Sequence, residues 1–177
     1  KGISLFIVPK FMVNDDGSLG DRNDVTCVGV EHKLGIHASP TCTMQYGDKG
    51  GATGYLVGEE NQGLMYMFKM MNNARLHVGL QGVSVAQMAY QKALDYAYDR
   101  PQGTDFDGND KSPIVNHPDV QRMLLTMRSL TEAARVLTYY AGAQMDIMTR
   151  SDDNEAKDDA VAICNLLTPI VKGFGTD

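Results

Sequence analysis

The spacing of apolar residues changes along the chain near residue 60. Before that point, apolar residues form short runs typical of β-strands, at residues 3–8, 25–30, 41–46 and 52–57. Clusters rich in Gly, Asp and Asn separate some of these runs, at residues 14–17 and 47–51. The pattern predicts an antiparallel sheet or barrel. Because only four strands are predicted, and one begins at the chain's first residues, we expect an incomplete sheet with unpaired edges.

From Gln62 onward the apolar residues recur at three- and four-residue steps, the period of an α-helix. A first helix is predicted over residues 62–99, and the Pro and Gly of the segment 99–103 end it. Gly79 and Gly82 lie inside this helix, where a glycine costs up to about 1 kcal/mol relative to alanine. Close contact with another helix is a reasonable compensation for that cost.

A second helix is predicted over roughly 119–149, with Pro118 suited to its first turn and Asp119 favourable at the positive end of the helix dipole. A third begins near residues 153–155, and we expect Pro169 to kink it or to start a new helical segment. Three long amphipathic helices with short connections predict an antiparallel bundle. Its apolar faces need a fourth helix, which these residues do not offer.

The composition is that of an ordinary globular protein, with 43% apolar and 21% charged residues. The net charge of -6, without clusters of Lys or Arg, argues against nucleic-acid binding. No apolar run reaches the roughly 18 residues of a membrane span, and the first residues have neither an initiator Met nor the layout of a signal peptide. Cys27, Cys42 and Cys164 are odd in number and widely spaced, which favours a reducing compartment over a disulfide framework or a zinc site.

Other kinds of site find little support. The histidines at 32, 37, 77 and 117 form no i,i+4 pair and have no carboxylate grouping nearby, so we expect no metal site. Their spacing gives no basis for a Ser-His-Asp triad. The segment Gly47–Gly54 lacks the Lys-Ser/Thr ending and the following helix of a phosphate-binding loop, and is predicted to be a hairpin turn.

Five short motifs occur in one consistent order along nearly the whole chain. They are KGISLFIVP at 1–9, GVEHKLGIHASPT at 29–41, YLVGEENQGL at 55–64, NNARLHVGLQG at 72–82 and ALDYAYDRPQG at 93–103. Each is weak alone, but the order and spacing together resemble the acyl-CoA dehydrogenase family. The insertion at 105–111 and the Met-rich first helix resemble the branch that contains the 3-methylmercaptopropionyl-CoA dehydrogenases.

The resemblance implies an α+β multidomain enzyme with an N-terminal helical domain, a central β-barrel, a C-terminal four-helix bundle and bound FAD. Residues 1–60 would be the C-terminal part of the antiparallel barrel, and residues 61–177 three of the four bundle helices. The parent protein would oxidise an acyl-CoA to a 2-enoyl-CoA, reduce an electron-transfer flavoprotein and form a homodimer or homotetramer. The bacterial cytoplasm is the favoured compartment, and the mitochondrial matrix is the alternative.

No catalytic residue is assigned within the chain. Removal of the α-proton from an acyl-CoA needs a positioned carboxylate, and by resemblance the family's glutamate is expected after Asp177. Four glutamates are interpreted as solvated or capping groups: Glu59, Glu60, Glu132 and Glu155. We therefore expect this chain alone not to turn over.

The resemblance implies two ligand contacts. Arg75 corresponds to the family's arginine beside the CoA moiety, with Asn72 a second polar contact, and guanidinium groups suit phosphates and purines. Arg100 and Gln102 correspond to residues at the FAD pyrophosphate of a neighbouring subunit, but Gly103 stands where the family has the Phe that packs on adenine. The structural alternatives are a salt bridge for Arg75, a capping or surface amide for Asn72, and a favourable helix-dipole position for Arg100.

Two other functional classes stay open. One is a non-dehydrogenase flavoprotein of the same fold, of the DNA-associated alkylation-response type, against which the acidic balance weighs. The other is a helical oligomerisation module, because a fold does not define a function. Exposed apolar helix faces would then predict self-association.

Overall fold

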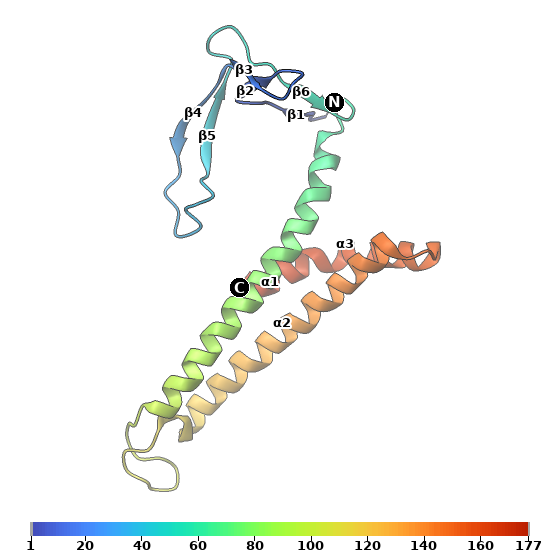
Figure 1. Cartoon of the computed structure of the whole chain (residues 1–177). Helices are drawn as coiled ribbons and strands as arrows, with labels where there is room; N and C mark the ends of the chain where they lie inside the picture. Colours follow the sequence, from blue (N-terminus) through green and yellow to red (C-terminus); the bar gives the residue numbers. More distant parts are fainter. Residues whose placement is uncertain (1, 177) are drawn as a thin grey trace. The chain divides into compact units, whose positions relative to one another are not determined.

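The computed structural model describes residues 2–176. It divides into two compact units, Lys1–Lys69 and Met70–Asp177, each of which is described by itself. The first unit is built from short strands and the beginning of a long helix, and the second from helices (Figure 1). This confirms the α+β composition and the predicted change from strands to helices near residue 60.

The first unit contains six strands (Figure 1): β1 Leu5–Ile7, β2 Phe11–Val13, β3 Leu19–Arg22, β4 Val25–Val30, β5 Cys42–Tyr46 and β6 Tyr55–Val57. Each of the four predicted runs contains a strand, and the hairpin β2–β3 was not predicted. The strands form three separate antiparallel pairs, β1 with β6, β2 with β3 and β4 with β5. Across residues 2–176 these pairs do not close into a barrel, so the barrel stays a prediction.

The prediction of a hairpin turn at Gly47–Gly54 is wrong. This segment leads from β5 to β6, and those two strands belong to different pairs. The cause lies in Asp24, between β3 and β4, whose carboxylate accepts the backbone N–H groups of Lys49 and Gly51 at 2.5 and 3.3 Å. The loop is thereby fastened to the β3–β4 corner, and the chain cannot fold straight back along β5.

Asn23 is the buried polar centre of the first unit, with 7% of its surface exposed. Its side-chain nitrogen donates to the carbonyl oxygens of Pro9 at 2.9 Å and Thr53 at 2.8 Å. Its side-chain oxygen accepts the N–H groups of Thr53 and Asp24, both at 2.9 Å. One amide thus joins three segments that are distant in sequence, and all of its hydrogen-bonding groups have partners.

Three long helices follow, as predicted: α1 Gly63–Asp99, α2 Pro118–Arg150 and α3 Asn154–Thr176, with a short 3₁₀ turn, η1 Ile114–Asn116, before α2. Pro118 occupies the first turn of α2, and Asp119 lies in the same turn. Pro169 lies inside α3, which continues to Thr176, so the predicted restart of the helix does not occur. None of the helices within residues 2–176 is long and apolar enough to cross a membrane.

Within the second unit, α2 runs antiparallel to the adjoining part of α1, and α3 returns against α2 to cross α1 (Figure 1). The core consists mainly of small apolar residues: Val83, Ala97, Leu124, Ala134, Ala141, Ala160, Cys164 and Val171. The buried threonines Thr131, Thr138 and Thr168 donate their hydroxyl protons to the carbonyl oxygen one turn earlier in their own helix, at 2.7–2.8 Å. Small side chains let the helices approach closely.

Candidate functional site

Asn72 and Arg75 form a polar pair on α1. Both side chains are half-buried, and one guanidinium nitrogen of Arg75 donates to the side-chain oxygen of Asn72 at 3.5 Å. Residues three apart on a helix are neighbours on its surface, so the helix itself brings the two together. The pair presents a planar cation beside an amide, a donor set that suits a phosphate or a purine. Its role in ligand binding stays a prediction.

Arg100 and Gln102 lie just after the end of α1. Hydrogen bonds fix their backbones, and their side chains are exposed. The N–H of Arg100 donates to the carbonyl of Tyr96 at 2.9 Å, and its carbonyl accepts the N–H of Ile114 at 2.9 Å. The N–H of Gln102 donates to Ser112 at 3.0 Å, and its carbonyl lies 2.7 Å from a ring nitrogen of His117. In the part of the chain that the structure describes, no ion pair engages the guanidinium of Arg100. An exposed cation on a fixed backbone suits an anionic ligand.

Gly103 adopts a backbone φ of +70°, a conformation that side chains other than glycine's rarely allow. This gives a physical reason for the departure from the family's Phe at this position, because a positive φ disfavours a bulky side chain. Phe106, by contrast, is 88% exposed in the loop that follows.

That loop is held by Asp105. Its carboxylate accepts the backbone N–H groups of Asn109 at 2.9 Å and Asp107 at 3.1 Å, and also the side-chain amide of Asn109. Hydrogen bonds from Asn109, with smaller contributions from Ser112 and Asp107, lower the pKa of Asp105 to about 2. Isolated antiparallel β-bridges join Pro101 to Pro113 and Thr104 to Asp110, so residues 101–113 form a short arm after Arg100.

The two predicted ligand contacts are not brought together. Arg75 lies roughly 24 positions before Asp99, the last residue of α1, which corresponds to about 36 Å along the helix. The pair Asn72–Arg75 and the pair Arg100–Gln102 are therefore far apart, and the ligand contact of each stays a prediction.

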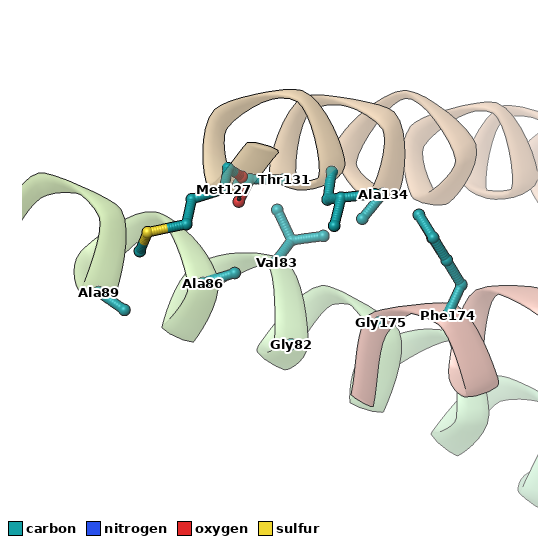
Figure 2. A pocket seen from close by; sticks show the side chains of 10 residues that line it. Gly82, Val83, Ala86, Ala89, Met127, Thr131, Ala134, Phe174 and Gly175 are labelled. Atoms are coloured by element: carbon teal, nitrogen blue, oxygen red, sulfur yellow. Dashed lines mark hydrogen bonds between the residues drawn. The ribbon is translucent and has the colours of Figure 1, made fainter. Parts of the chain in front are cut away.

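An apolar groove of about 400 Å³ opens between α1, α2 and α3. It is lined by Gly82, Val83, Ala86, Ala89, Met127, Leu130, Thr131, Ala134, Phe174 and Gly175. Figure 2 shows Val83 on α1 directed towards Thr131 and Ala134 on α2, with Phe174 at one end. The Thr131 hydroxyl is already bonded to the carbonyl of Met127, so the groove wall is essentially apolar. Sequence reasoning did not identify this groove.

The close helix contact predicted at Gly79 and Gly82 is confirmed. A Cβ atom added to Gly79 would meet Val171 on α3, and one added to Gly82 would meet the carbonyl of Gly175. Sequence reasoning did not identify the partner residue, Gly175 on α3.

The glutamates agree with their interpretation as solvated or capping groups. Glu132 forms an ion pair with Arg135 at 2.8 Å, and Glu155 lies in the first turn of α3. Glu59 and Glu60 are exposed. Across residues 2–176, no three His, Cys, Asp or Glu side chains are grouped so as to hold a metal ion.

Comparison with known proteins identifies the family. Residues 61–169 match the model of the acyl-CoA dehydrogenase C-terminal domain. The chain is 50% identical over 179 residues to 3-methylmercaptopropionyl-CoA dehydrogenase of Ruegeria pomeroyi, a match covering 100% of this chain and 30% of that protein. This confirms the predicted resemblance to that branch. The chain thus spans about 30% of the length of the curated relatives it matches.

Two solved structures share the fold. ACDH-11 of Caenorhabditis elegans, in complex with C11-CoA, matches 93% of this chain and 31% of its own, with a TM-score of 0.71 at 19% identity. Butyryl-CoA dehydrogenase of Megasphaera elsdenii matches 87% of this chain and 40% of its own, with a TM-score of 0.58 at 22% identity. With the family model and the motifs in agreement, the chain belongs to the acyl-CoA dehydrogenase family.

Proposed function

We propose that the protein containing this chain is an FAD-dependent acyl-CoA dehydrogenase that oxidises an acyl-CoA thioester to the 2-enoyl-CoA. The observation that carries the proposal is membership of the family, from the domain model over residues 61–169 and the 50% identity to a 3-methylmercaptopropionyl-CoA dehydrogenase. That relative makes a short acyl-CoA with a thioether the first substrate to test. An electron-transfer flavoprotein as acceptor, a homodimer or homotetramer, and the bacterial cytoplasm are parts of the same proposal.

Each of the two predicted domain segments has a proposed place in the enzyme. Residues 1–60 contribute strands to the central barrel domain, and residues 61–177 contribute three helices of the C-terminal bundle. The carboxylate that removes the α-proton is proposed to lie outside these residues, because Glu132 is already paired with Arg135 and the other glutamates are exposed or start a helix. The contribution of this chain is therefore to hold ligands.

Asn72 and Arg75 are proposed to hold the CoA part of the substrate. The half-buried guanidinium is partly oriented by the Asn72 side chain, which reduces the side-chain entropy lost on binding. A planar guanidinium can form two parallel hydrogen bonds to a phosphate or stack on the adenine ring. By holding the remote end of the substrate, the pair would position the acyl group for reaction.

Arg100 and Gln102 are proposed to hold the pyrophosphate of FAD. Their side chains fit this group because one is an exposed cation without an ion pair in the described residues and the other an exposed amide donor. When bound, FAD supplies the acceptor for the hydride that leaves the β-carbon. Gly103 offers no side chain to pack on the adenine, so the contact here is polar.

The test uses the full-length protein. It is expected to carry a flavin absorbance band and to reduce an artificial electron acceptor when 3-methylmercaptopropionyl-CoA or butyryl-CoA is added. Arg75→Ala is expected to raise KM for the acyl-CoA by about 10- to 100-fold, because a hydrogen bond to a charged group is worth about 1.5–3 kcal/mol. Arg100→Ala is expected to lower flavin content.

Arg128→Ala is the matched control, since Arg128 is an exposed arginine on α2. It is expected to leave KM and flavin content unchanged. A full-length protein that binds no flavin, or that reduces no acceptor with any acyl-CoA, contradicts the proposed function.

A further inference from the structure

The antiparallel pair β4–β5 places Cys27 and Cys42 on one face. Cys27 pairs with Met44, and Cys42 pairs with Val30. Side chains alternate between the two faces of a strand, so Met44 and Cys42, two residues apart, point the same way. Cys27, opposite Met44, shares that face. The two cysteines, 15 residues apart in sequence and without a recognisable spacing motif, are therefore diagonal neighbours across two strands.

The pairing is irregular at this point. The register shifts between Cys27 and Gly29, so β4 has one more residue than β5 there. Such a bulge bends its strand and increases its twist. Diagonal Cα atoms in a regular pair lie roughly 7–8 Å apart, whereas a disulfide needs about 4.4–6.8 Å. A shift of about 1 Å between the strands closes the difference, and β4 and β5 are paired only with each other in the described residues.

The thiols differ in exposure. Cys27 is exposed and Cys42 is half-buried, and both are free. A hydrogen bond with the Cys27 thiol, followed by burial, raises the pKa of Cys42, and Lys33 opposes this weakly. The Cys27 thiol also donates to the backbone carbonyl of Gly29 at 3.3 Å. Because the thiolate is the nucleophile in disulfide exchange, the exposed Cys27 is suited to react first and Cys42 to complete the bond.

We propose that Cys27 and Cys42 are a modification site, at which a low-molecular-weight disulfide such as glutathione disulfide forms a reversible bond between them. In the first step, the Cys27 thiolate attacks one sulfur of glutathione disulfide, forming a mixed disulfide and releasing one glutathione thiolate. In the second, the Cys42 sulfur attacks the Cys27 sulfur, forming the Cys27–Cys42 disulfide and releasing the second glutathione. The two protons lost by the cysteines pass to the two glutathione thiolates, so two protein thiols are oxidised and one disulfide is reduced.

Trypsin separates the relevant cysteines into three peptides. Cleavage after Lys and Arg places Cys27 in residues 23–33, Cys42 in residues 34–49 and Cys164 in residues 158–172. The experiment incubates the full-length protein with glutathione disulfide, blocks remaining thiols with N-ethylmaleimide, and identifies the peptides by mass spectrometry. Peptide 23–33 linked to peptide 34–49 is expected, together with loss of the blocked forms of both. Dithiothreitol is expected to reverse the change.

The variants separate the two steps. Cys42→Ser is expected to stop at a glutathione mixed disulfide on Cys27, and Cys27→Ser to lose the linked peptide. Cys164→Ser is the matched control and is expected to form the linked peptide as the unmodified protein does, because Cys164 is buried in α3. In urea, the preference for the Cys27–Cys42 pair over Cys164 is expected to disappear.

Two results would overturn the proposal. One is a mixed disulfide that persists on Cys27 of the unmodified protein without any linked peptide. The other is that both thiols stay free in protein that circular dichroism shows to be folded. The proposal does not depend on the acyl-CoA dehydrogenase activity, and either outcome leaves that activity untouched.

Discussion

The backbone of Gly82 on α1 lies directly against the carbonyl group of Gly175 on α3. Gly175 is also close to Gly79, since a Cβ atom on Gly175 would lie 3.0 Å from the Gly79 carbonyl oxygen and 3.1 Å from its Cα atom. Two helices approach this closely only where neither has a side chain. The crossing therefore fixes the position of α3 along α1.

Gly82→Ala is predicted to lower the free energy of unfolding by about 1–3 kcal/mol, the usual cost of overpacking. The new methyl group would occupy the position of the Gly175 carbonyl, and a backbone group cannot turn aside as a flexible side chain can. Urea denaturation of the purified protein measures the change.

Gly142→Ala is the matched control for this prediction. Gly142 lies within α2, and an added Cβ atom would meet no heavy atom within 4 Å. This substitution is predicted to be neutral or to raise stability by up to about 1 kcal/mol, through helix propensity alone. Equal effects at the two positions would show that α1 and α3 are not in close contact at Gly82 and Gly175.

The hydrogen bond between Arg135 on α2 and Gln87 on α1, 2.7 Å long, is predicted to contribute about 1 kcal/mol to the pairing of these helices. Glu132 orients the same guanidinium at 2.8 Å, and the Arg135 side chain is 27% exposed. A double-mutant cycle with Arg135→Ala and Gln87→Ala measures the coupling. The exposed pair Arg122–Asp119, at 66% and 73%, is the control and is predicted to couple by less than about 0.5 kcal/mol.

Asn23→Ala is predicted to destabilise the first unit by about 2 kcal/mol or more, because it leaves the carbonyls of Pro9 and Thr53 without their donor in a buried setting. Asn23→Asp is predicted to be worse at neutral pH, since it has nearly the same shape but turns an anionic oxygen towards those two carbonyls. Urea denaturation of both variants checks the order. An aspartate tolerated better than alanine would refute the described network.

The arm after Arg100 is predicted to loosen in acid. Hydrogen bonds lower the pKa of Asp105 from an ordinary 3.8 to about 2, so its contribution to stability is complete above pH 3.8 and disappears as the pH falls towards 2. The amide signal of Asn109 in NMR spectra is expected to titrate with an apparent pKa near 2. Asp105→Ala is expected to abolish this titration and to expose Phe106 to faster cleavage by thermolysin.

The sequence predicted the helices well because their determinants are local. Pro118 at the start of α2 and Pro101 after the end of α1 act within one turn of the boundaries they define. The four strand runs were found for a similar reason. The hairpin β2–β3 was missed because its strands are short and its residues 19–22, Leu-Gly-Asp-Arg, have no apolar alternation.

The remaining features depend on contacts between distant segments. The direction of the loop after β5 is decided by Asp24, some 25 residues earlier, and no local pattern reports such a bond. The groove between the helices depends on how α3 crosses α1. For the candidate site, the motifs predicted Arg75 and Arg100 individually, and the structure adds the contact from Asn72 and the backbone conformation that disfavours a side chain at Gly103.

The buried threonines of the helical unit have a consequence for how sequences of this kind can diverge. Thr131, Thr138 and Thr168 donate their hydroxyl protons to the preceding turn of their own helix, so these hydroxyls need no partner on the neighbouring helix. These threonines therefore do not select a particular residue on the neighbouring helix. The residues at the helix interfaces can therefore be replaced by other small apolar residues, while the glycine contacts determine how the helices are aligned. Across relatives, we expect those glycines to be the last positions to change.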